Sequence, residues 1–156
     1  MYHHTESFDL DKYIGAPWYQ LMGYLQPFQT PLDYNTTATY SLNPDGSVKV
    51  HNTTITKGEV RSATGRAVPT SIPGEFCVTF GFFPCFSKHP NYVIESIWRD
   101  ENGNYVAAVV TDSKRNSLYV LSRTRFPPIS MYDMLIKYVH DNFNAKKVIH
   151  TPHYTD

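Results

Sequence analysis

Residues 91–124 read NYVIESIWRDENGNYVAAVVTDSKRNSLYVLSRT and decide the fold of this chain. Three apolar, β-prone runs lie at 92–98, 105–111 and 118–124. The segments between them are short and contain the Asp, Asn, Gly and Lys residues that are typical of turns. Because three consecutive strands joined by short polar turns form an antiparallel meander, the sequence predicts a β-sheet that the rest of the chain extends or closes.

Five more runs with strand-like composition precede the meander, at 18–25, 36–42, 47–53, 60–68 and 75–80. Polar and apolar residues alternate in the second and third, and Asn43-Pro44-Asp45-Gly46 between them is a turn signature. A series of short strands like this suggests either a β-sandwich or an up-and-down β-barrel. Closure into a barrel would remove the exposed edges of so long a sheet.

One helix is expected after the strands, with Ser130 as its N-cap. Its apolar residues have helical spacing and form a single stripe: Met131, Met134, Leu135, Tyr138 and Val139. The strand at 105–111 is apolar on both faces, so we expect this helix to cover its outer side. Residues 147–150 could add a short ninth strand, and the polar segments 1–7 and 151–156 are expected to be flexible tails of a single domain.

The composition excludes several classes of protein. A chain of 156 residues suits one domain, and its zero net charge argues against a nucleic-acid partner. No apolar run is long enough to span a membrane, and the N-terminus has no signal peptide. We therefore expect a cytosolic or membrane-peripheral protein if the chain is complete, and a secreted or periplasmic one if it is a mature form.

Motifs spread over nearly the whole chain resemble the lipocalin family, and most of all its group of bacterial lipocalins, apolipoprotein D and plant temperature-induced lipocalins. They are FDLDKYIG at 8–15 followed by Trp18-Tyr19, ATYSL at 38–42 with Asp45-Gly46, LYVLSRT at 118–124 and IHTP at 149–152. The resemblance implies an all-β fold: an eight-stranded antiparallel up-and-down barrel with one C-terminal helix packed outside. Residues 26–33, 56–59, 81–90 and 112–117 would then surround its open mouth.

The resemblance also implies a barrel floor in which Trp18 packs against Arg123. A guanidinium group over an indole ring stabilises a fold by about 0.5–2 kcal/mol. One departure from the family motif affects this floor, because two residues, Ala16 and Pro17, separate Gly15 from Trp18. Proline has no N–H, so the first strand should begin with a bulge or an unpaired position, which could displace Trp18.

The function that the resemblance implies is carriage of a small lipophile such as a fatty acid or lysophospholipid. Periodicity alone fits a filled interior as well as a lined cavity, and the resemblance favours the cavity. Tyr40 and Tyr119 would offer hydroxyls to a ligand. The residues expected to line the cavity are Met22, Ala38, Tyr40, Val48, Val50, Ala67, Val78, Phe80, Ile94, Tyr119 and Leu121.

Aromatic and basic residues are expected to gather around the mouth: Phe28, Phe82, Phe83 and Phe86, with Lys57, Lys114 and Arg115. Aromatic rings flanked by cations suit an anionic membrane surface. One hypothesis is that the mouth docks on such a membrane and loads lipid there. The alternative is that the phenylalanines fold inward and cap the cavity.

No signature of an enzyme, metal site or cofactor site stands out, so we predict a binding protein with no catalytic residue, cofactor or metal. His3, His4, His150 and His153 are expected in solvated tails. Cys77 is either a small buried thiol or the partner of Cys85 in a disulfide. Two alternatives stay open: a ligand-free interaction module, and a lipid isomerase or synthase that uses a residue with a perturbed pKa. In each case the protein is expected to be a monomer or a homodimer.

Overall fold

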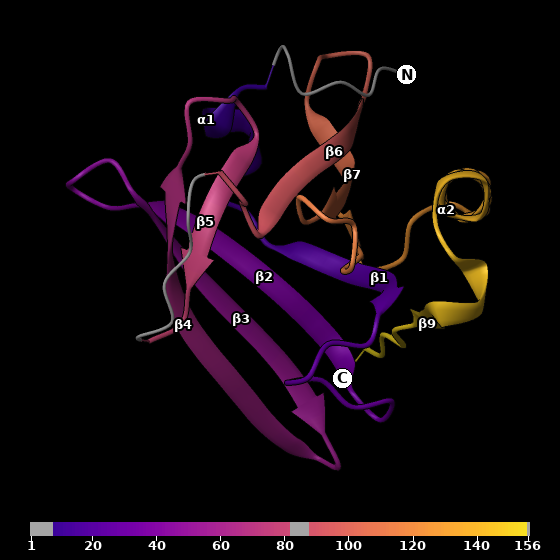
Figure 1. Ribbon diagram of the computed structural model, residues 1–156. Coiled ribbons are helices and arrows are strands. Elements are labelled where there is room, and N and C mark those ends of the chain that lie inside the picture. Colours follow the sequence, from indigo (N-terminus) through magenta and orange to yellow (C-terminus); the bar gives the residue numbers. More distant parts are fainter. Residues whose placement is uncertain (1–7, 82–87, 156) are drawn as a thin grey trace.

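The computed structural model describes residues 8–81 and 88–155 and confirms the predicted all-β architecture. Eight antiparallel strands form a closed barrel, and a ninth strand and the C-terminal helix α2 (Ile129–Asn142) lie together outside it (Figure 1). A short helix α1 (Leu10–Tyr13) precedes the barrel, and a 3₁₀ turn η2 (Ala145–Lys147) follows α2. The strands are β1 (Trp18–Tyr24), β2 (Tyr34–Leu42), β3 (Val48–Thr56), β4 (Glu59–Pro69), β5 (Glu75–Thr79), β6 (Tyr92–Arg99), β7 (Tyr105–Thr111), β8 (Tyr119–Ser122) and β9 (Val148–His150).

The barrel closes where β1 meets β2. Strands β2 to β8 are hydrogen-bonded in sequence order, β8 pairs with β1, and β1 pairs with β2 through Trp18 opposite Ala38. The second half of β1 pairs with β9 instead, with Met22 opposite His150. The strand order is therefore the predicted up-and-down order, and β9 lies at the seam of the barrel.

The segment after β9 is hydrogen-bonded across this seam. The Thr151 N–H donates to the carbonyl of Leu21 on β1, at 2.9 Å. On the other side, the Asn35 N–H of β2 donates to the carbonyl of Pro152, also at 2.9 Å. The expected flexible tail thus begins with residues that are anchored to two strands of the barrel.

Two clusters of buried apolar residues form the core. The interior cluster lies inside the barrel and contains Trp18, Tyr40, Val50, Ile94 and Leu121 among others. The helix cluster lies between the outer face of the barrel and α2, and it consists of Leu21, Met22, Tyr24, Trp98, Ala107, Val109, Leu118, Val120, Leu135 and Val139. Because Ala107 and Val109 join the helix cluster while Ala108 and Val110 join the interior cluster, β7 is covered on both faces, as predicted.

Helix α2 begins earlier than Ser130. Its N-cap is Pro128, which makes no side-chain capping hydrogen bond. The prediction of Ser130 as the cap is wrong, because proline holds the extended backbone that precedes a helix and the chain turns directly after it. The Tyr132 N–H closes the first turn on the Pro128 carbonyl, at 3.0 Å. Within the described residues, no helix has the length and apolar character that crossing a membrane requires.

Irregularities in β6 change which side chains point inward. The pairing of β6 with β7 shifts between Ile94 and Ser96. Ile94 and Ile97 both lie in the interior cluster, whereas Ser96 donates to the Tyr138 hydroxyl of α2 at 2.6 Å. Ser96 therefore faces α2 rather than the interior, because a bulge resets the alternation of a strand.

Candidate functional site

The wall of the barrel interior is formed mainly by the residues that the sequence predicts. Six of these residues are at least 95% buried, and three more are partly buried against them. They come from six of the eight barrel strands, so the wall exists only when the barrel is closed. The nine residues are Ala38, Tyr40, Val48, Val50, Ala67, Val78, Ile94, Tyr119 and Leu121.

Met22 is not part of this wall. The pairing of β1 with β8 shifts between Gln20 and Met22, so that Met22 lies opposite Val120. Without this shift, Met22 would lie opposite Tyr119, whose side chain packs against the interior cluster. Both Met22 and Val120 belong to the helix cluster. The prediction of Met22 as a cavity residue is wrong, because the bulge turns the second half of β1 outward.

Phe80 lies next to the interior but outside the core. Its side chain is 42% exposed. A Cβ atom built on Gly65 would come within 2.8 Å of the Phe80 ring, so the ring lies directly against the glycine backbone. The absence of a side chain at Gly65 of β4 therefore leaves room for this bulky neighbour.

The floor of the barrel has the arrangement that the resemblance implied. The Arg123 guanidinium lies 4.0 Å from the centre of the Trp18 ring and donates to the carbonyls of Lys12 and Tyr13, at 2.9 and 2.8 Å. Trp18 is fully buried, and its indole N–H donates to the Tyr13 carbonyl at 2.9 Å. Pro17 does not displace Trp18, because β1 begins only after the proline and its bulge lies further along the strand.

Three tyrosine hydroxyls meet inside the barrel. The Tyr92 hydroxyl lies 2.5 Å from that of Tyr13 and 2.7 Å from that of Tyr40. These side chains come from β6, α1 and β2, so the contact joins three distant parts of the chain. We call them the hydroxyl triad. Tyr13 was not predicted as a site residue. The only feature of the sequence that could have indicated it is its position among the apolar residues of the short segment before the barrel.

Burial keeps the hydroxyl triad neutral. Loss of hydration raises the pKa of Tyr40 to about 12, although its hydrogen bonds to the other two tyrosines act in the opposite direction. The pKa values of Tyr13 and Tyr92 also rise well above their ordinary value, because of burial first and then because of repulsion between neighbouring phenolates. The triad can therefore donate and accept hydrogen bonds at neutral pH, but it carries no charge.

A small cavity lies beside the triad. The space open to the centre of a water molecule is about 10 Å³, close to the smallest volume that holds one water. None of its lining residues is charged, and the three tyrosines provide its only side-chain polar atoms. The lining consists of Leu10, Tyr13, Ile14, Tyr40, Val48, Ala67, Phe76, Val78 and Tyr92.

The barrel interior becomes polar and open toward the mouth. Strands β3 and β4 pair without interruption from Val48 opposite Ala67 to Thr56 opposite Glu59, so the inward face continues through alternate residues. The inward-facing residues near the mouth include Asn52 and Thr54 on β3 and Arg61 on β4. Residues 59–64 of β4 are exposed to solvent. A ligand inside the barrel would thus meet apolar groups at depth and polar groups near the opening.

The rim of the mouth exposes apolar and basic side chains. Phe28 is 63% exposed and Leu32 is 58% exposed, and both lie in the loop between β1 and β2. Lys57, in the turn between β3 and β4, and Lys114, in the turn between β7 and β8, are exposed as well. The predicted mouth residues Phe82, Phe83 and Phe86 lie outside the described residues.

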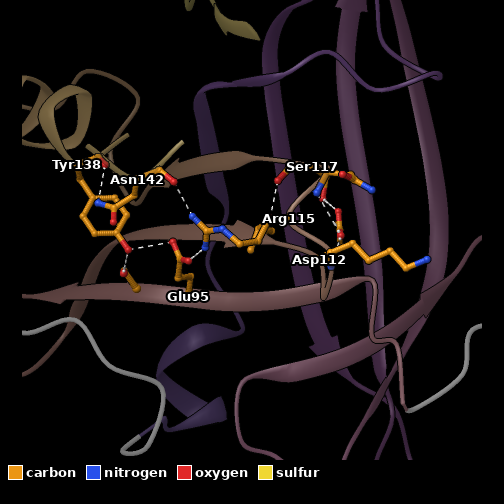
Figure 2. Close-up of polar contacts among 10 residues, drawn as sticks. Glu95, Asp112, Arg115, Ser117, Tyr138 and Asn142 are labelled. Carbon is orange, nitrogen blue, oxygen red and sulfur yellow. Dashed lines mark hydrogen bonds and ion pairs between the residues drawn. The ribbon is translucent and has the colours of Figure 1, made fainter. Parts of the chain in front are cut away.

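Arg115 has a different role from the one expected. Its guanidinium forms an ion pair with Glu95 on β6 and donates to the carbonyl of Asn142 at 2.7 Å (Figure 2). The guanidinium also lies 4.2 Å from the centre of the Phe143 ring. Tyr138 of α2 donates to the same Glu95, at 2.9 Å. Arg115 lies in the turn between β7 and β8, among the segments expected around the mouth, but Glu95 and the end of α2 engage its guanidinium.

Among residues 8–81 and 88–155, the remaining reactive groups form no second site. Cys77 is disulfide-bonded rather than a free thiol, and Cys85, the only other cysteine of the sequence, lies outside the described residues. His150 is within hydrogen-bond distance of the Tyr132 hydroxyl, at 2.7 Å, and His153 of the Gln20 carbonyl, at 2.6 Å, so neither is free in a tail. In the described part of the chain, no three His, Cys, Asp or Glu residues gather in a way that could hold a metal ion.

Known proteins share this sequence pattern and this fold. A family model described as a lipocalin-like domain matches residues 8–153. The chain is 29% identical to temperature-induced lipocalin-1 of Arabidopsis thaliana over 155 residues, which cover 95% of this chain and 81% of that protein. It is 30% identical to the outer membrane lipoprotein Blc of Escherichia coli over 150 residues, covering 93% and 79% respectively. Among solved structures, the cockroach allergen Per a 4 matches in fold with a TM-score of 0.67 at 13% identity, over 96% of this chain and 90% of that one.

Proposed function

Because this chain belongs to the lipocalin family, we propose that it binds one small hydrophobic ligand inside its barrel and carries it. The observation that carries this proposal is the gradient along the interior. Buried apolar side chains and neutral hydroxyls lie at depth, and exposed polar side chains lie toward the mouth. Ligand sites in proteins have this composition: a mostly apolar wall with a few polar groups that fix orientation.

The gradient suits a lipid with one chain and a polar head. An acyl chain would lie along the apolar wall, beside Val78 and Tyr119, where its burial contributes about 0.8 kcal/mol for each methylene group. The head would lie near Asn52, Thr54 and Arg61, where a guanidinium group can pair with a carboxylate or phosphate. Fatty acids and lysophospholipids meet both requirements.

We also propose that the mouth meets an anionic membrane when the ligand is loaded. Phe28 and Leu32 would enter the interface between lipid heads and chains. Three exposed lysines surround the opening (Lys57, Lys88 and Lys114), and each would contribute about 1 kcal/mol of attraction to an anionic leaflet. This part of the proposal rests on the rim alone and can fail without affecting the ligand site.

Flotation with phosphatidylserine-containing liposomes tests the membrane step. We expect Leu32→Ser to reduce the fraction of protein that floats, because one buried leucine contributes about 1.5–3 kcal/mol when it leaves water. Phe126→Ser is the matched control, since Phe126 is exposed to the same extent, 58%, and lies on the link between β8 and α2. Equal flotation of the parent, Leu32→Ser and Phe126→Ser would refute docking through the rim.

A further inference from the structure

Residues 151–154 bridge a gap in the wall of the barrel, and we call them the strap. Strands β1 and β2 pair at only two positions, both at the floor end of the seam. Beyond these pairs the strap is hydrogen-bonded to β1 through Thr151 and to β2 through Pro152, as described above. The Tyr154 N–H adds a second bond to β2, since it donates to Oδ1 of Asn35 at 2.7 Å. The strap therefore ties together two strands that no longer pair with each other.

His153 anchors the middle of the strap and is partly buried there. Its Nε2 lies 2.6 Å from the Gln20 carbonyl of β1, so this nitrogen carries the hydrogen and donates it. The His153 ring is nearly perpendicular to the Tyr19 ring of β1, with 5.9 Å between their centres. The Arg125 guanidinium lies 5.2 Å from the centre of the same Tyr19 ring and donates to the Tyr154 carbonyl at 3.2 Å.

The second ring nitrogen of His153 makes the site unfavourable for a charged imidazole. Within residues 8–81 and 88–155, its Nδ1 is buried and has no hydrogen-bond partner. Protonation would turn this atom into a donor without an acceptor and would add a positive charge near Arg125. Loss of hydration and repulsion by Arg125 lower the pKa of His153, although its hydrogen bond to the Gln20 carbonyl acts in the opposite direction. No carboxylate in the described part of the chain contributes to this pKa.

We propose that His153 is an acid-sensitive latch that holds the strap across the seam and releases it when the imidazole is protonated. In a detached strap the imidazole would have its ordinary pKa of 6.5, so the detached form binds the proton more readily than the docked form. The hold is therefore fully present above about pH 6.5 and is lost as the pH falls through the lowered pKa of docked His153.

Release of the strap would open the side of the barrel. A small polar cavity lies against the strap at the seam, with about 20 Å³ open to the centre of a water molecule. Its lining includes Gln20 of β1, Thr36 of β2 and Thr151 of the strap. Under the proposed function, this opening would give a ligand an exit between β1 and β2 in acid. The latch itself does not depend on a ligand, so it can fail without affecting the proposed function.

Hydrogen exchange at about pH 7 and about pH 5 tests the latch in the protein without added ligand. The reporters are the amides of Asn35, Thr151 and Tyr154, which are the donors that join the strap to β1 and β2. Their rates are expressed as protection factors, because these remove the pH dependence of intrinsic exchange. We expect the protection of all three to fall severalfold in acid, whereas the amides of β7 keep theirs.

Two histidine variants separate the latch from other effects of acid. His153→Gln removes the titrating group but keeps a side-chain N–H for the Gln20 carbonyl, so protection at the three reporters should be the same at both pH values. His150→Gln is the matched control, because His150 belongs to β9 and contacts the Tyr132 hydroxyl instead. This variant should lose protection in acid as the parent does. As a second readout, nuclear magnetic resonance should show that Arg125→Met raises the pKa of His153, because a repelling charge is gone.

Three results would overturn the latch. The first is unchanged protection of the reporters in the parent between the two pH values. The second is an equal loss in the parent and in His153→Gln, because another group would then be titrating. The third is a loss confined to Tyr154, since that would be fraying of the chain end while the strap stays bonded to both strands.

Discussion

At the scale of single residues, the buried tyrosines couple the stability of the barrel to alkaline pH. Tyr40 has a pKa raised to about 12 by burial, against an ordinary value of 10.0. Above pH 10 the unfolded chain releases this proton while the folded chain keeps it. The stability that neutral Tyr40 contributes is therefore fully present below pH 10 and is lost as pH rises toward about 12.

Urea unfolding at a series of pH values between 9 and 12 measures this loss. We expect the free energy of unfolding to fall by about 1.4 kcal/mol per pH unit for each tyrosine that folding holds neutral. Tyr40→Phe should make this slope shallower, because the variant has one such group fewer. Val48→Ala perturbs the same wall without removing a titrating group and should keep the parent slope. Identical slopes in the parent and Tyr40→Phe would contradict the assignment.

Single residues of the wall could be predicted from the sequence wherever strands alternate without interruption. Tyr40, Val48 and Val50 belong to such a stretch. Each faces the barrel interior, as the alternation of polar and apolar residues predicted. Met22 and Ser96 do not, because each follows a bulge that exchanges the two faces of its strand. The local sequence does not indicate these bulges. They bend the strands so that the barrel can close, and they do not arise from the conformational preferences of the residues at the bulge.

At the scale of elements, α2 is held by its C-terminal end as well as by its apolar stripe. Arg115 has a positive φ of 58° in the turn between β7 and β8, and this backbone conformation is unusual for a residue with a side chain. From there its guanidinium reaches Glu95 and the last carbonyl of the helix (Figure 2). A cation at that position also suits the negative end of the helix dipole.

Hydrogen exchange in the last turn of α2 tests this contact. Arg115→Met should speed amide exchange at residues 139–142 by about fivefold, which corresponds to about 1 kcal/mol for one charged hydrogen bond at a partly exposed site. Lys137→Met is the control, because Lys137 pairs with Asp141 on the exposed side of the same helix. A similar change in both variants would show that Arg115 has no special role.

Elements were predictable where the signal is local. The strand at Tyr105–Thr111 has the expected bounds, and its apolar character on both faces correctly indicated the helix outside it. The anchoring of residues 151–154 was not predictable, because it depends on groups of β1 and β2 that come together only when the barrel closes. The role of Arg115 was missed for a similar reason, since its partners lie on β6 and α2.

At the scale of the whole molecule, the barrel has two different ends. The floor end is closed by Trp18 and Arg123 and by the short helix that contributes Tyr13. The mouth end is polar inside and carries exposed apolar and basic side chains on its rim. Under the proposed function, this polarity along one axis would give a ligand a single direction of entry, from the open mouth toward the hydroxyl triad.

In the function that we propose, the interior of the barrel, rather than its surface, holds the ligand. Native mass spectrometry during titration with dodecanoic acid tests it, with two variants at neighbouring positions of β2. Ala38 faces the interior, whereas Thr39 lies opposite His51 on the outer face. Each position receives a phenylalanine, and circular dichroism checks that both variants fold. We expect one bound ligand in the parent and in Thr39→Phe, and an affinity reduced by about tenfold in Ala38→Phe, because the added ring occupies ligand space. Absence of binding in the parent, or equal binding in both variants, would contradict it.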